Sequence, residues 1–122
     1  MFRFHKNEPL VFQKSDENII KQNLLSVYCH LDHNELKVHA RFIKMAIESI
    51  DRGDSERMIS LITSSEVIGG SGSIFDLDLG QEFDIKFLKL LKSIKSAVAN
   101  NKRLNSTILL LERLEKKRFN DK

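Results

Sequence analysis

The residues best suited to metal chemistry lie near the end of a predicted helix. Cys29 and His33 are four positions apart, so these two residues lie on one helical face, and His30 lies between them in the sequence. Zinc sites use three or four protein ligands, and the remaining histidines, His5 and His39, do not form the expected second pair. We therefore expect no metal and no cofactor, and we interpret the segment as a buried cysteine beside polar histidines.

A glycine-rich segment at residues 69–73, Gly-Gly-Ser-Gly-Ser, could hold a nucleophile or a phosphate. A nucleophilic serine elbow has the form Gly-x-Ser-x-Gly, which this spacing does not match. A phosphate-binding P-loop continues with Lys and Ser or Thr, whereas Ile74 and Phe75 follow here. The sequence therefore favours a protein that is not an enzyme, with a structural loop built on Gly69, Gly70 and Gly72.

Helical spacing of apolar residues predicts the elements that position these groups. Helices are expected at about 16–31, from the Asp32–Glu35 step to Gly53, and at 55–62, 82–100 and 105–119. Ser15 is a predicted N-cap, Asp32 and Glu35 resemble a capping box, and Gly53 is a predicted C-terminal stop.

The regions between and before these helices differ from them. Residues 67–80 form a loop in this interpretation, with Ile74, Phe75, Leu77 and Leu79 turned inward and a short extended segment at 74–79. Residues 1–13, around Pro9, are predicted to be a short extended arm, because proline prevents a helix across them.

A length of 122 residues suits one hydrophobic core, and 41% hydrophobic with 30% charged residues is a globular composition. We predict a single all-α domain over residues 1–122, a small helical bundle of about five helices with a glycine-rich loop and an extended N-terminal arm. The chain has one cysteine and no apolar run of about 18 residues, which leads us to expect a cytoplasmic protein with no membrane partner.

The net charge of +3 is divided unevenly along the chain. Residues up to Gly80 include 9 Lys or Arg against 12 Asp or Glu, and residues from Gln81 onward include 11 against 5. The basic half offers an alternative function, a nucleic-acid-associated regulator. Successive lysines in this half are three apart and therefore drift by about 60° around a helix, which disfavours a compact nucleic-acid patch. The basic residues concerned are Lys86, Lys89, Lys92, Lys95, Arg113, Lys116, Lys117 and Arg118.

The middle of the chain resembles a family of bacterial proteins. Residues 69–73 and the following Asp76-Leu77, between helical stretches at 47–61 and 83–98, resemble immunity proteins of contact-dependent inhibition and related polymorphic toxin systems. The resemblance implies a helical protein that binds a cognate toxin domain tightly and neutralises it by steric occlusion, without catalysis. Many nuclease inhibitors of this kind are strongly acidic, whereas this chain is slightly basic.

Acidic residues are the partner-binding candidates, because complementary charge fixes the register of a protein–protein contact. One group surrounds the glycine loop and the other lies at the predicted turn between the second and third helices. These residues are Glu66, Asp76 and Asp78, and then Glu48, Asp51 and Asp54.

Overall fold

The computed structural model describes residues 12–64, 67, 73–74, 77–101, 111–113 and 116, apart from the side chains of residues 100 and 101. Within these residues the structure is helical and contains no strand, so the predicted all-α class is confirmed. The helices with defined bounds are α2 (Lys14–His33), α3 (Lys37–Asp51), α4 (Ser55–Ile62) and α6 (Gln81–Asn101).

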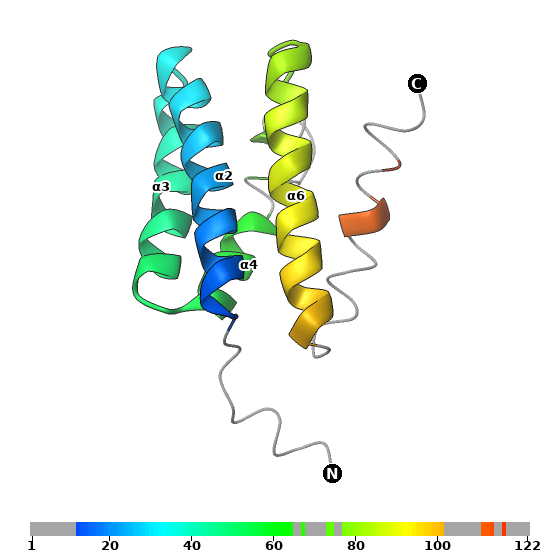
Figure 1. The fold of residues 1–122 in the computed structure, drawn as a ribbon. Coiled ribbons are helices and arrows are strands. Elements are labelled where there is room, and N and C mark those ends of the chain that lie inside the picture. Colours follow the sequence, from blue (N-terminus) through cyan, green and yellow to red (C-terminus); the bar gives the residue numbers. More distant parts are fainter. Residues whose placement is uncertain are drawn as a thin grey trace.

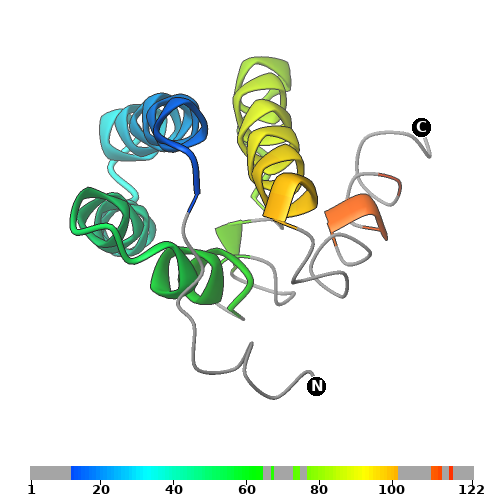
Figure 2. The same cartoon turned by 60° about the horizontal axis from the view of Figure 1, so that its bottom comes forward.

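The helices form a bundle in which α2 packs against both α3 and α6 (Figure 1). α2 runs antiparallel to each of these neighbours, and the short α4 follows α3 at the end of the bundle where α2 begins. Turned by 60°, the bundle shows α2 at one edge with α3 and α6 on either side of it (Figure 2). One long side of α2 therefore faces away from the bundle.

The core follows the predicted helical stripes. On α6 the six residues expected on one face are all buried, namely Phe83, Phe87, Leu90, Leu91, Ile94 and Val98. α2 contributes Ile20, Leu24, Val27 and Leu31, spaced by three or four residues. Helical period in the sequence thus predicts which faces are buried.

The start of α2 differs from the prediction. Gln13 is the N-cap residue, in an extended conformation and without a side-chain capping bond, so the assignment of Ser15 as N-cap is wrong. The N-cap therefore lies two residues before the predicted one. Phe12, immediately before the N-cap, is buried in the core and anchors the chain there. The predicted acidic first turn is confirmed, with Asp16 and Glu17 at the positive end of the helix dipole.

The junction of α2 and α3 also differs from the prediction, because Asp32 and Glu35 do not form a capping box. Asp32 lies inside α2, and its carboxylate accepts a hydrogen bond of 2.8 Å from Lys37 Nζ. Glu35 closes the helix in the left-handed region, at φ 62°. Its N–H donates to Asp32 O and that of Leu36 donates to Leu31 O, both at 3.0 Å, and this pattern terminates a helix without a side-chain cap.

Gly53 stops α3 as predicted, at φ 78°. The N–H of Gly53 donates to Ile50 O at 3.0 Å, and that of Asp54 donates to Ser49 O at 2.8 Å. These two bonds form the same closing motif as at Glu35, now with the residue type that adopts positive φ without strain. α4 then begins at once, with the predicted bounds.

Several predictions lie partly outside the described residues. Of the N-terminal arm, Phe12 is described and is buried; of the last predicted helix, residues 111–113 are helical and Leu111 is buried. Of the loop anchors, Ile74 is buried and Leu77 and Leu79 are partly buried against the core, while Phe75 lies outside the described residues. Residues 77–80 belong to no helix or strand, and the predicted extended segment at 74–79 is only partly described, so it stays a prediction.

Candidate functional site

The turn between α3 and α4 brings together three of the predicted partner-binding acids. Glu48, Asp51 and Asp54 are all exposed, and we call these three residues the acidic turn. Asp54 is also the N-cap of α4, because its Oδ1 accepts a hydrogen bond of 3.1 Å from Arg57 N–H. The closing motif at Gly53 fixes the backbone on the other side of Asp54, so the turn is held at both ends.

The acidic turn is not uniformly negative. Asp51 Oδ1 lies 2.6 Å from Lys21 Nζ on α2, and the two side chains are 49% and 40% exposed. An ion pair this exposed contributes about 0–1 kcal/mol to stability. Arg52 and Arg57 alternate with the acids along the chain and are exposed as well. Glu48 is therefore the acid of the turn with neither a cap nor an ion pair assigned to it.

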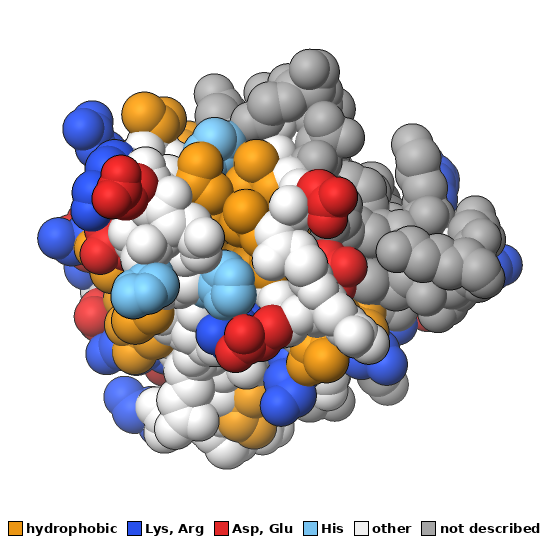
Figure 3. Space-filling model, turned by 90° about the horizontal axis from the view of Figure 1, so that it is seen from above, with side chains coloured by type: hydrophobic (Ala, Val, Ile, Leu, Met, Phe, Trp, Pro, Cys, Tyr) orange, Lys and Arg blue, Asp and Glu red, His pale blue; other side chains and the backbone are white. Residues whose placement is uncertain are grey.

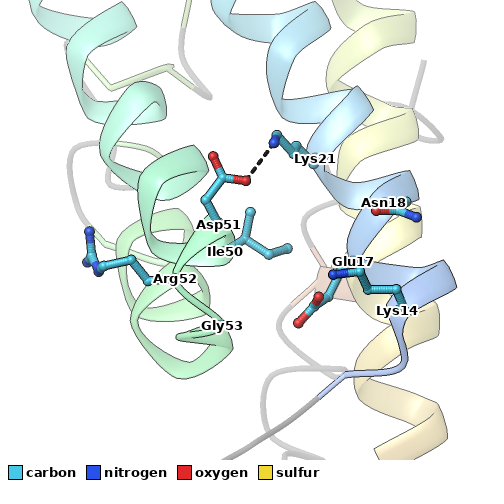
Figure 4. Close-up of a pocket in the computed structure, with 8 residues that line it drawn as sticks. All are labelled: Lys14, Glu17, Asn18, Lys21, Ile50, Asp51, Arg52 and Gly53. Carbon is cyan, nitrogen blue, oxygen red and sulfur yellow. Dashed lines mark ion pairs between the residues drawn. The ribbon is translucent and has the colours of Figure 1, made fainter.

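A groove of about 320 Å³ lies beside the acidic turn, between the first turns of α2 and the end of α3. The Lys21–Asp51 ion pair crosses it, and the Glu17 and Lys14 side chains extend toward it from α2 (Figure 4). Its lining is of mixed charge and consists of Lys14, Glu17, Asn18, Lys21, Ile50, Asp51, Arg52 and Gly53. Two acids and three bases nearly cancel, so charge alone selects no ligand for it.

Sequence reasoning missed the α2 side of this groove. Lys14, Glu17 and Lys21 are more than 25 positions from the residues they face on α3. The available signal was the i, i+3 and i+7 spacing of these three residues, which puts them along one side of α2.

The loop candidates are only partly described. Asp78 is exposed, as expected from alternation with Leu77 and Leu79. Glu66, Asp76 and the glycines Gly69, Gly70 and Gly72 lie outside the described residues, so the loop itself stays a prediction.

The Cys29 segment is arranged differently from our interpretation. Cys29 is exposed, so its assignment as a buried cysteine is wrong. Residue 29 is two positions after the buried Val27, which on a helix turns its side chain about 200° away from the core. His33 is also exposed, while His30 is partly buried. Within the described residues, no three His, Cys, Asp or Glu side chains gather closely enough to hold a metal ion.

His30 contacts α6. Its Nδ1 lies 3.1 Å from Lys86 Nζ, and its ring centroid is 5.3 Å from that of Phe83. This contact lies at the end of the bundle where α2 stops and α3 and α6 begin. Seen from that end, histidine side chains border a group of hydrophobic side chains, with acidic side chains nearby (Figure 3).

The lysines of the alternative function follow the predicted spread around α6. Lys86 is partly buried and lies 3.7 Å from Glu82 as well as near His30. Lys89 and Lys92 are exposed, and Lys95 is partly buried. Arg113 and Lys116 are exposed, while Lys117 and Arg118 lie outside the described residues. The first of these lysines is thus engaged by neighbouring side chains.

No helix among the described residues is long and apolar enough to cross a bilayer. Comparisons of the chain with models of protein families, with curated proteins and with solved structures find no match.

Proposed function

We propose that this chain is a binding protein without catalytic activity that neutralises a cognate bacterial toxin domain by covering its active surface. The observation that supports this function is the acidic turn, which presents exposed carboxylates on a backbone fixed at both ends. The resemblance of the glycine loop and its flanking helices to bacterial immunity proteins supplies the class of partner.

The acidic turn is supported from beneath by the core. Ile50, at the end of α3, and Met58 and Ile59, on α4, are at most 5% exposed. A surface held in its binding geometry loses little conformational freedom on association, so more of the contact energy appears as affinity. Rigidity of this kind suits steric occlusion, in which the inhibitor must keep its shape against the toxin.

The charges of the acidic turn would determine how the toxin domain is oriented on this protein more than how tightly it binds. Glu48 offers an exposed carboxylate, whereas Asp51 is partly neutralised by Lys21 and Asp54 is engaged in capping α4. We propose that Glu48 faces a basic patch on the toxin domain, and that the protein acts in the cytoplasm, where a toxin that has entered the cell must be neutralised.

The test is to ask whether the gene immediately upstream of this chain encodes a toxin domain, and to co-express that domain with the chain. Cells that express both should grow, and the Glu48→Lys variant should protect them less. Glu112→Lys is the matched control, because Glu112 is an exposed acid in segment 111–113, which lies beyond α6 from α3 (Figures 1 and 2).

Three results would contradict the proposal. The first is the lack of any toxin gene in that position, and the second is cell death despite co-expression of the wild-type chain. The third is binding of generic DNA or RNA whose affinity falls steeply with salt, because phosphate contacts by the basic half would produce that dependence.

A further inference from the structure

The outward side of α2 has an unusual composition for a solvent-exposed helix face. After Lys14, the residues of α2 classed as exposed include no Asp, Glu, Lys or Arg. We call them the neutral face, and they are Ser15, Asn18, Ile19, Gln22, Leu25, Cys29 and His33. The face extends over nearly the whole length of the helix.

The other helices show the usual pattern of charges toward solvent. Exposed residues of α3 include Lys37, Arg41, Lys44, Glu48 and Asp51, and those of α6 include Glu82, Lys89 and Lys92. With 30% charged residues in the chain, the neutral face is a local departure.

α2 does carry charges, but they lie on its flanks. Asp16, Glu17, Lys21 and Asp32 are partly buried. Lys21 pairs with Asp51 at 2.6 Å, and Asp32 pairs with Lys37 at 2.8 Å. Both pairs join α2 to α3. The charged residues of α2 that form them therefore lie beside the neutral face and not on it.

Large apolar side chains occupy the neutral face. Ile19 is 51% exposed and Leu25 is 42% exposed, and both are among the four large hydrophobic residues that stand exposed in the described part of the chain. They are six positions apart, or about 9 Å along the helix axis. Cys29, also exposed, extends this apolar character by one turn.

We infer that the neutral face binds a second copy of this chain, with α2 packed antiparallel against α2 of the other copy. A two-fold contact places each surface against itself, so like charges would meet wherever the surface is charged. The exposed cations of α3 would repel their copies, whereas the neutral face brings no charged side chains together. Pairing with itself also removes Ile19 and Leu25 from water.

The area of the neutral face sets the strength of this contact. A helix of 20 residues is about 30 Å long and about 10 Å wide, so one face covers about 300 Å². Stable interfaces bury about 800 Å² per partner. The dimer should therefore be weak and in rapid exchange, as expected for a contact smaller than a standard interface.

Sedimentation velocity on the full chain, from about 10 µM to about 1 mM under reducing conditions, tests this dimer. The weight-average mass of the wild type should rise from the monomer value of 14.1 kDa as concentration increases. Leu25→Glu should weaken association at least about tenfold, because it places two carboxylates at the contact. Ile85→Glu is the matched control, since Ile85 is 51% exposed on α6, and it should associate like the wild type.

Circular dichroism of each variant checks that the fold is retained, and Ile19→Lys repeats the test with the opposite charge if Leu25→Glu fails to fold. A wild type that remains at 14.1 kDa at every concentration would overturn the inference. Equal weakening by Ile85→Glu would do so as well. Toxin neutralisation depends on Glu48 and not on the neutral face, so the two proposals can fail separately.

Discussion

Lys86 Nζ on α6 lies 3.1 Å from His30 Nδ1 on α2, in a polar contact between two helices whose buried contact faces are mainly apolar. A second polar contact in the same interface is longer, from Asn23 Nδ2 to Lys89 O at 3.4 Å. The sequence separation of 56 residues makes His30–Lys86 one of the long-range contacts that fix how α2 and α6 are aligned.

We expect this contact to contribute about 0.5–1.5 kcal/mol to the free energy of unfolding. A double-mutant cycle with His30→Ala and Lys86→Ala, measured by urea denaturation, isolates the pairwise energy from the loss of each side chain's other contacts. Strictly additive effects of the two substitutions would show that the contact adds nothing to stability.

Replacing Glu35 by glycine should stabilise the protein. Glu35 adopts φ 62°, where a residue with a Cβ is strained by about 1 kcal/mol and glycine is not. Gly53→Ala should have the opposite effect, because Gly53 has φ 78° at the equivalent position of α3 and an added Cβ there meets no atom within 4 Å, so the cost is conformational. Thermal and urea unfolding of the two variants should shift in opposite directions, and shifts of the same sign would refute the assignment.

Ser55 and Ser49 form a matched pair of buried serines. Ser49 Oγ donates a hydrogen bond of 2.9 Å to Met45 O, whereas Ser55 Oγ has no partner. Ser49→Ala should therefore cost about 1 kcal/mol, and Ser55→Ala should be neutral or stabilising because it removes an unsatisfied buried hydroxyl. Urea denaturation measures both variants, and a larger loss for Ser55→Ala than for Ser49→Ala would contradict this account.

The pKa of Lys37 should lie above the ordinary value for a lysine side chain. The hydrogen bond from its ammonium to the Asp32 carboxylate, together with the charge of Asp32, raises the pKa of Lys37 above its usual value. Because the folded-state pKa is raised, the stability from this pair is complete below about pH 10.4, the pKa of an unfolded lysine, and is lost as pH rises through the folded-state pKa. Titration of the lysine side-chain carbons by NMR should show a lower pKa for Lys37 in the Asp32→Asn variant than in the wild type. The Glu82→Gln variant should leave the pKa of Lys37 unchanged.

The helices and their buried faces could be predicted because both depend on neighbours three and four residues away. Residues 55–62 and the six buried residues of α6 were predicted correctly on that basis. The exposure of Cys29 also follows from spacing, since it lies opposite Val27 on the helix; the error came from applying the average burial of cysteine in place of the local period.

Helix ends were predicted less well, because they depend on tertiary contacts. Asp32 and Glu35 have the spacing of a capping box, yet α2 continues through Asp32 and ends at a residue with positive φ. Glycine at position 53 predicts a residue with positive φ at the end of α3, whereas glutamate at position 35 gives no such indication for α2. The groove depends on packing of α2 against α3 and therefore could not be predicted from either segment alone.

The most direct test of the proposed function is isothermal titration calorimetry of the purified chain with the toxin domain that, under this proposal, the gene immediately upstream encodes. The account predicts tight one-to-one binding by the wild type and by Glu112→Lys, and binding at least about tenfold weaker for Glu48→Lys, as expected when a central charged contact is reversed. No binding by the wild type, or equal affinity of Glu48→Lys and wild type, would contradict the claim that the acidic turn docks the toxin.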